Sequence, residues 1–324
     1  MDFLQELPEQ IFRDILLRIS YESQSKIKQL LKPAKEMMEC FKFYQDRIKF
    51  GLANKYICFL QRCEVSIYDP IDHSCKPFRT EHEISHSSKI INVNHKIVVL
   101  DGHFSLSPKI WIYDLLSSTW KRGADIPTPS DRNKYAWCAS PDGSIYIAGG
   151  YDTIAGRKLR DAAVYKVDED KWELLPQMYE NVGRYCRGFF IEGMFYVLYR
   201  YRTQRFDPNT RVWTTIANMS LPYSYYYDLL YAFGRLIAFT TKGIEEYDWE
   251  GSVWREVEPL PQGFTVLHAT VWYDQIFLRG YSNFMRPIFY MYKPGAALTE
   301  RWISIEEPNI FLENYVESIV TIEI

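Results

Sequence analysis

The residues of this 324-residue sequence that could do chemistry are mainly arginines, tyrosines and histidines in short segments spread along its last four-fifths. Arginine and tyrosine dominate the energetics of binding sites, because each joins hydrogen-bonding groups to a large planar surface. The candidate binding residues are His86, Lys89, Arg132, Tyr135, Trp137, Arg184, Arg187, Tyr223, Tyr226, His268 and Tyr315. If the chain is an enzyme, acid–base chemistry would fall to His268 or a tyrosine such as Tyr226, with Arg187 orienting the substrate.

Most of these candidates also have a structural explanation. A lone histidine such as His268 is more often a hydrogen-bonded structural residue than a general base. The tyrosines between positions 223 and 227 are individually more typical of packing, since strand alternation sends neighbouring side chains to opposite faces. For Arg132 and Arg184, a binding role is the favoured interpretation.

No established catalytic motif accompanies the candidate residues. The sequence has no GxSxG nucleophile turn, no HExxH zinc motif and no phosphate-binding loop. Its six cysteines are scattered without a CxxC pair, and the sequence shows no metal-ligand spacing. We therefore expect no metal and no cofactor.

The composition limits which classes of binding partner and which cell compartment we expect. The chain has 38 basic and 41 acidic residues and a net charge of -3, which is not the electrostatic footprint of a nucleic-acid or membrane-surface protein. No apolar run reaches the ~20 residues of a membrane span, and charged residues occupy the place of a secretory apolar core. Reduced cysteines would suit the cytoplasm or the nucleus, which is the expected location.

The elements that must position the candidate residues form a repeat. Six segments share one plan, in which an aromatic residue ends a strand and a turn leads to a tryptophan. The aromatic residues are Tyr68, Tyr113, Tyr165, Phe206, Tyr247 and Tyr292, which recur every 41 to 52 residues. The tryptophan follows after seven residues in the four central units and after ten in the sixth, while Phe78 takes that place in the first. This period predicts a β-propeller of six blades.

Two domains follow from the change of periodicity near residue 50. Before it, apolar residues recur at intervals of three and four, which predicts helices, and after it they alternate. We expect a helical block over residues 1–50 and a mainly β, six-bladed propeller over residues 51–324. The first unit begins at Tyr56 without a leading strand, and the tail at residues 315–324 should supply that strand and seal the ring.

The repeat resembles the kelch motif. The best match runs from Gly149-Gly150 through Tyr165 to Trp172, which reproduces the double glycine, aromatic residue and tryptophan of that family in order. The resemblance covers about four-fifths of the chain. It implies that the loops leading into the innermost strands crowd around one mouth of a central channel and hold the target. Arg132 and Arg184 stand where kelch repeats often carry a pocket arginine.

The start of the chain resembles an F-box, the helical module that docks on the Skp adaptor of cullin–RING ubiquitin ligases. Leu7-Pro8-Glu9-Gln10-Ile11 and Leu16-Leu17 carry the resemblance, and an F-box followed by kelch blades is a large plant family. The resemblance implies that Leu7, Pro8, Ile11, Leu16 and Leu17 contact the adaptor.

The second half of the helical block departs from that family. Residues 30–34 stand where the family usually has a Val-Cys-basic-x-Trp stretch, and truncating a buried tryptophan costs ~3–5 kcal/mol. Pro33, which precedes Ala34, would cost ~3 kcal/mol more inside a helix, so we expect it to end or kink the helical stretch that contains Leu30. Two interpretations stay open: an F-box that binds its adaptor, and a helical block that only packs on the propeller.

Two classes of function follow. In the first, the chain is the substrate-recognition subunit of a Skp–cullin–F-box ubiquitin ligase, and the target protein binds at the channel mouth. The resemblance implies targets such as phenylpropanoid enzymes. In the second, the F-box no longer functions, and the propeller binds or converts a small plant metabolite of specialised metabolism in its central pocket. A scaffold without either activity is a third, less specific option.

Overall fold

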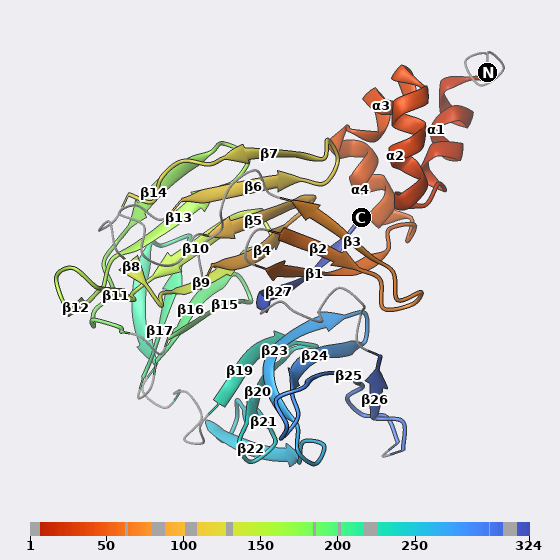
Figure 1. Ribbon diagram of the computed structural model, residues 1–324. Coiled ribbons are helices and arrows are strands. Elements are labelled where there is room, and N and C mark those ends of the chain that lie inside the picture. Colours follow the sequence, from red (N-terminus) through yellow and green to blue (C-terminus); the bar gives the residue numbers. More distant parts are fainter. Residues whose placement is uncertain are drawn as a thin grey trace.

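The protein folds as a β-propeller preceded by short helices. The computed structural model describes residues 7–61, 64–79, 88–100, 109–127, 132–183, 186–199, 202–216, 219, 226–297, 299–306 and 316–324. In these ranges, four helices precede six four-stranded antiparallel sheets that form the blades (Figure 1). The mainly β, six-bladed architecture predicted from the repeat is confirmed.

Each of the first three blades is a four-stranded sheet, whose strands follow one another from the channel outwards. Blade 1 contains β27 (Val316–Glu323), β1 (Lys55–Gln61), β2 (Glu64–Tyr68) and β3 (Cys75–Arg79). Blade 2 contains β4 (Lys89–Val93), β5 (Lys96–Leu100), β6 (Ile110–Asp114) and β7 (Thr119–Arg122). Blade 3 contains β9 (Ala136–Ala139), β10 (Ser144–Ala148), β13 (Ala162–Lys166) and β14 (Lys171–Leu175). A small sheet of β8 (Arg132–Asn133), β11 (Tyr151–Asp152) and β12 (Arg157–Lys158) accompanies blade 3.

The other three blades repeat this order. Blade 4 contains β15 (Arg187–Ile191), β16 (Met194–Leu198), β17 (Thr203–Asp207) and β18 (Val212–Ile216). Blade 5 contains β19 (Tyr226–Ala232), β20 (Arg235–Thr240), β21 (Ile244–Asp248) and β22 (Val253–Glu258). Blade 6 contains β23 (Thr265–Trp272), β24 (Gln275–Tyr281), β25 (Pro287–Tyr292) and β26 (Trp302–Ile305). The innermost strands of neighbouring blades contact one another around the whole ring.

The ring closes where the end of the chain pairs with its first strand. Strand β27 lies antiparallel to β1, with Glu323 opposite Lys55 and Val316 opposite Gln61. It supplies the innermost strand that the sequence lacks before β1. Closure also buries apolar side chains of the tail, since Val316 and Ile322 are fully inaccessible to solvent. A closed ring leaves no innermost sheet edge for another chain to pair with.

The repeated aromatic residues hold the blades together. In blades 2 to 6 each tryptophan lies directly opposite the aromatic residue of its repeat, as in the Tyr165–Trp172 pair, whose ring centroids are 4.9 Å apart. The indole of Trp172 also donates a hydrogen bond to the carbonyl of Ala124 in the preceding segment, and that of Trp213 does the same to Pro176. Each such tryptophan therefore packs within its own blade and is bonded to the blade before it.

Blade 1 departs from the repeat in a way that the sequence analysis misassigned. Cys75, and not Phe78, lies opposite Tyr68. Phe78 instead contacts Tyr113 of blade 2, with ring centroids 5.3 Å apart. Cys75 follows Tyr68 by seven residues, which is the spacing of the central units, so blade 1 has cysteine at the position that tryptophan takes in those units.

The helical block consists of α1 (Glu9–Leu17), α2 (Tyr21–Leu30), α3 (Lys32–Met38) and α4 (Phe41–Lys49). Pro33 lies in the first turn of α3, where its missing N–H needs no partner. Helix α2 ends before it, as expected, and α3 and α4 follow. None of the helices that the structure describes is long and apolar enough to cross a membrane.

The block is anchored to blades 1 and 2 on one side of the ring (Figure 1). The guanidinium of Arg47 donates to the carbonyls of Leu17, Ile19 and Leu52, so it joins the end of α1 to the segment that enters β1. His95, in the turn after β4, packs against the rings of Phe41 and Tyr44 of α4.

Contacts from α2 reach the same side of blade 2. The hydroxyl of Tyr21 donates to the carbonyl of Leu115, and the ammonium group of Lys28 donates to that of Leu116. Both carbonyls belong to the turn after β6. Backbone hydrogen bonds between Asn54 and Ile324 lie at the end of β27, so the helices pack where the ring closes.

Removing residues 315–324 should unfold the propeller rather than shorten it. The deletion leaves the inner edge of β1 unpaired and removes Val316 and Ile322, whose burial contributes ~1.5–3 kcal/mol each. The thermal transition measured by circular dichroism should disappear or move to a much lower temperature. The graded control is Ile322→Val, which should cost only ~0.5–1.5 kcal/mol. A truncated chain that keeps its full melting temperature would contradict the closure argument.

Candidate functional site

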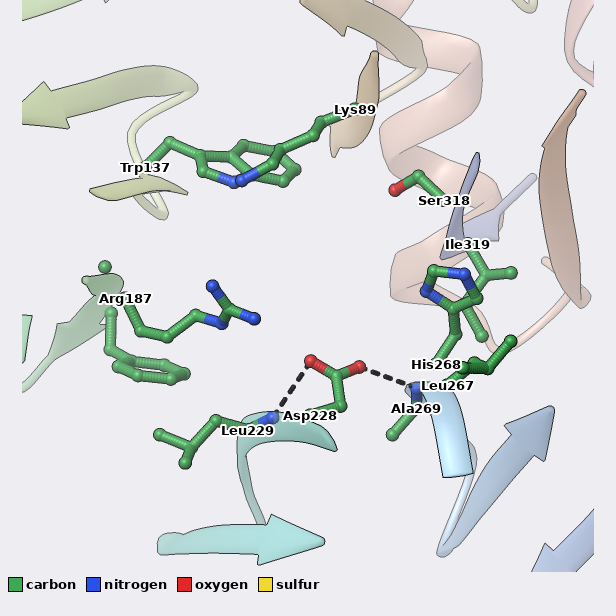
Figure 2. A pocket seen from close by; sticks show the side chains of 12 residues that line it. Lys89, Trp137, Arg187, Asp228, Leu229, Leu267, His268, Ala269, Ser318 and Ile319 are labelled. Atoms are coloured by element: carbon green, nitrogen blue, oxygen red, sulfur yellow. Dashed lines mark hydrogen bonds between the residues drawn. The ribbon is translucent and has the colours of Figure 1, made fainter. Parts of the chain in front are cut away.

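The six innermost strands surround a cavity of ≈ 290 Å³ at the centre of the ring (Figure 2). All six blades contribute to it, from the first residues of these strands. The lining residues are Lys89, Trp137, Arg187, Gly188, Phe189, Asp228, Leu229, Leu267, His268, Ala269, Ser318 and Ile319. The volume is close to the lower end of the range for small-molecule sites, ~300–1,000 Å³.

Three of the innermost strands carry a β-bulge where they line the cavity. The pairing register shifts between Tyr226 and Asp228 in β19, and between Val266 and His268 in β23. A third shift lies between β1 and β27, next to Ser318. A bulge inserts one extra residue, bends the strand and redirects its side chains, and such bulges are common beside functional sites. Here they bring Asp228, His268 and Ser318 into the lining of blades 5, 6 and 1.

Lys89 brings a strongly desolvated cation to the opposite wall of the cavity. Its ammonium nitrogen lies 5.4 Å from the centroid of the Trp137 ring and 5.9 Å from that of Tyr135. Burial, and after it the nearby charge of Arg187, lowers the pKa of Lys89 to about 8. Part of the lysine population is therefore neutral near physiological pH, although both aromatic rings favour its charged form.

Blade 4 supplies a second cation and a tightly fitted wall. Arg187 begins β15, and its side chain extends towards the centre of the cavity (Figure 2). Gly188 follows it, and a Cβ atom there would lie 2.6 Å from the backbone nitrogen of Trp137. Only glycine lets β15 approach β9 this closely, and the approach brings Arg187 and Trp137 together.

Asp228 joins blades 5 and 6 beneath the cavity. Its carboxylate accepts a hydrogen bond of 2.9 Å from the backbone N–H of Leu229 and one of 2.8 Å from that of Ala269 on β23 (Figure 2). His268 makes the next link, because its Nε2 lies 3.2 Å from the carbonyl oxygen of Val316 on β27. A carbonyl only accepts, so Nε2 carries a proton in this arrangement. Polar contacts thus connect β19, β23 and β27 in sequence.

The structure gathers four of the residues that the sequence analysis proposed. Lys89, Trp137, Arg187 and His268 all line the cavity. Arg132 and Tyr135 are not in its lining. Arg132 is buried and donates to the carbonyls of Gly149 and Asp161, and its guanidinium lies 5.7 Å from the Tyr135 ring.

The remaining candidates are not among the side chains that the structure describes. The positions concerned are His86, Arg184, Tyr223 and Tyr315, which lie outside the described residues. Tyr226 begins β19, but its side chain is likewise outside the described part. Among the described residues, no group of three or more histidine, cysteine or acidic side chains could hold a metal ion.

Asp228 and Ser318 were missed by the sequence analysis, although both line the cavity. A weak signal exists for Asp228, which is a carboxylate between two aromatic residues and two leucines in a segment that otherwise suits a buried strand. Nothing in the sequence around Ser318 indicates that it lines the cavity, because its place in the lining depends on the bulge in β27. Bulges depend on pairing between strands and leave no local sequence pattern.

As a chemical environment, the cavity suits binding better than catalysis. It presents two cations, one carboxylate, a histidine and a set of apolar side chains around a small volume. His268 and Asp228 both hold backbone groups of neighbouring strands, which is a structural task. A general base must instead reach a proton of a bound substrate.

Comparison with known proteins agrees with this architecture. The kelch motif family matches residues 134–179, a segment that runs from the start of blade 3 to just past β14. Two similar proteins come from Arabidopsis thaliana. F-box/kelch-repeat protein At1g80440 is 26% identical, and the match covers 63% of this chain and 63% of that protein. F-box/kelch-repeat protein At1g15670 is 24% identical, and the match covers 63% of this chain and 64% of that protein. The human Kelch-like protein 23 is 31% identical over 34% of this chain and 21% of its own.

The six blades and the matched repeat define a kelch-type β-propeller with a central cavity. In sequence, the chain is similar to plant proteins that bear the name F-box/kelch-repeat protein. It spans slightly less than two thirds of the length of the two Arabidopsis relatives.

Replacing Asp228 with asparagine should loosen the contact between blades 5 and 6. An amide has one carbonyl oxygen in place of two carboxylate oxygens, so the N–H of Leu229 or Ala269 loses its acceptor, at a cost of ~1–3 kcal/mol. The free energy of unfolding in urea should fall by that amount. The control is Asp168→Asn, which removes an exposed partner of Lys96 worth at most ~1 kcal/mol. Equal losses in the two variants would refute the assigned role of Asp228.

Proposed function

We propose that the chain is the substrate-recognition subunit of a Skp–cullin–F-box ubiquitin ligase. The helical block would bind the Skp adaptor, and the propeller would bind the target protein at the channel mouth. The observation that carries the proposal is the combination of a folded helical block with a kelch propeller, in a chain whose plant relatives bear the name F-box/kelch-repeat protein.

The outer face of α1 supports an adaptor-binding role. Ile11 and Ile15 are 50% and 41% exposed, although both are large and apolar. They lie four residues apart on one helix and therefore share a face. Pro8 is exposed and Leu7 half-buried just before this helix. Paired apolar side chains on one exposed helix face are a common basis for docking on a partner.

Leu16 and Leu17 would act differently from the other implied adaptor contacts. Both are buried in the core of the block with Ala34, Met38 and Phe43. Their role in adaptor binding would be indirect, since they hold α1 against α3 and α4.

The departures from the F-box pattern do not prevent the block from folding. Pro33 is accommodated in the first turn of α3, and Ala34 beside it is fully buried. The small side chain at position 34 therefore belongs to a closed core in this protein. A folded block of this kind is compatible with adaptor binding.

The block and the cavity lie at opposite ends of the innermost strands. The cavity is lined by the first residues of β4, β9 and β15, whereas the block contacts the turns that follow β4 and β6. In antiparallel blades, the ends of β4 and β6 lie on the same side of the ring. A target at the channel mouth would thus leave the adaptor side free. The expected compartment is the cytoplasm or the nucleus, and a phenylpropanoid enzyme is one class of target.

A second candidate function is small-molecule binding in the central cavity, with the F-box no longer active. The observation that favours it is that Lys89, Arg187, Asp228 and His268 all line one central cavity. If the chain converted its ligand, Arg187, His268 and Tyr226 would be the residues to test first.

The adaptor proposal predicts that aspartate at Ile11 and Ile15 abolishes co-purification with a Skp adaptor. Charged side chains in the centre of an apolar interface should weaken binding by roughly tenfold or more. The control is Ile71→Asp, which changes an exposed isoleucine of the propeller, and it should leave adaptor capture unchanged.

The adaptor proposal fails if the full chain captures no Skp adaptor under conditions in which another F-box protein does. It also fails if the Ile11→Asp, Ile15→Asp double variant captures the adaptor as well as the unmodified chain, with its melting temperature unchanged.

A further inference from the structure

The lining of the cavity has an imbalance of charge. Lys89 and Arg187 contribute two positive charges, and Asp228 contributes one negative charge. The two oxygens of Asp228 already accept backbone hydrogen bonds, which occupies part of their capacity. When Lys89 is protonated, these three side chains together carry one surplus positive charge.

Lys89 is the side chain that carries this surplus. Among the described residues, no carboxylate lies within ion-pair distance of its ammonium group, and the rings of Tyr135 and Trp137 are its neighbours. A desolvated ammonium group without a counter-charge is costly, and folding alone would favour an apolar side chain there. Its retention at the centre of a cavity is typical of a site that receives its counter-charge from a ligand.

The rest of the lining is suited to an organic molecule. Trp137, Phe189, Leu229, Leu267 and Ile319 present aromatic and aliphatic surface to the same volume. Inorganic anions gain nothing from such surface, whereas the apolar body of an organic acid does. Asp228 would repel a second negative charge on the ligand.

We propose that the central cavity binds a small organic monoanion, a carboxylate held between Lys89 and Arg187 with its apolar body against Trp137 and Phe189. The proposal deepens the second candidate function by naming the class of ligand, and it does not depend on adaptor binding. A planar ring would fit best, because Trp137 offers a ring face and glycine at position 188 keeps the neighbouring wall close.

The protonation state of Lys89 makes the affinity depend on pH. Arg187 and Lys134 disfavour the charged lysine, whereas Asp228 and Cys186 favour it, and burial outweighs them all to give a pKa of about 8. Only the protonated form attracts a carboxylate. Affinity should therefore be constant well below pH 8 and fall as the pH rises above it.

The experiment is calorimetric titration of the full chain with benzoate and 4-hydroxybenzoate, each compared with its neutral amide. We expect the carboxylates to bind and the amides to bind at least tenfold more weakly, as for the loss of a charge-assisted contact. For benzoate, which does not titrate in this range, the affinity should fall by roughly 30-fold between pH 6.5 and pH 9.5, the factor by which the protonated fraction of Lys89 decreases.

Three variants distinguish binding at Lys89 from a general effect of removing a positive charge from the protein. Lys89→Met should abolish carboxylate binding without lowering the melting temperature, because it replaces a desolvated charge with an apolar side chain of similar length. Lys89→Arg should keep binding but lose the pH dependence, since arginine stays charged throughout. Lys171→Met, on the exposed outer strand of blade 3, should change neither property.

Several results would overturn the proposal. These are no measurable binding of either carboxylate at 10 mM, equal binding of amides and carboxylates, and Lys89→Met binding as well as the unmodified chain. A fall in the melting temperature of Lys89→Met would instead assign the lysine a structural role. None of these outcomes bears on capture of the Skp adaptor, so the two proposals can fail separately.

Discussion

The pairing of the last strand with the first is the interaction on which the rest of the structure depends. Strands β1 and β27 come from opposite ends of the propeller sequence, and their hydrogen bonds turn a row of sheets into a ring. The same strand supplies Ser318 and Ile319 to the cavity and accepts a hydrogen bond from His268 through Val316. Ile324, which follows this strand, bonds to Asn54 in the segment between the helical block and β1. The end of the chain therefore contributes to the closure of the ring, to the cavity and to the attachment of the helical block.

Much of the fold could be predicted from the sequence, because a propeller is built from local units. The aromatic residue and the tryptophan of one repeat lie a few residues apart and face each other across a hairpin, as Tyr165 and Trp172 do, so their spacing records the blade directly. Position 75 was misread because the pattern was sought in the type of residue, whereas the hairpin conserves the spacing of seven. Pro33 was read as a helix end and begins the next helix, since a proline in a first turn and one after a last turn look alike in sequence.

The cavity could be predicted only in part, for a physical reason. Residues at the start of an innermost strand are candidates by topology alone, which is why Lys89, Trp137, Arg187 and His268 were found. Whether a side chain then points into the channel depends on bulges, and these arise from the pairing of two strands. Arg132 illustrates the opposite case, because its position was right for a pocket residue, while its hydrogen bonds hold the carbonyls of Gly149 and Asp161 within blade 3. Sequence position identifies the ring of candidates, and the network of hydrogen bonds decides among them.

The polar groups of the cavity wall differ in how far contacts within the protein compensate them. Asp228 and His268 each satisfy backbone groups of a neighbouring innermost strand, so their polarity is compensated within the protein. Lys89 has aromatic neighbours and a second cation nearby, and its burial is only partly offset. Proteins commonly depart from the most stable choice of residue at the positions that serve function. The incompletely compensated charge of Lys89 is therefore informative about what the cavity holds.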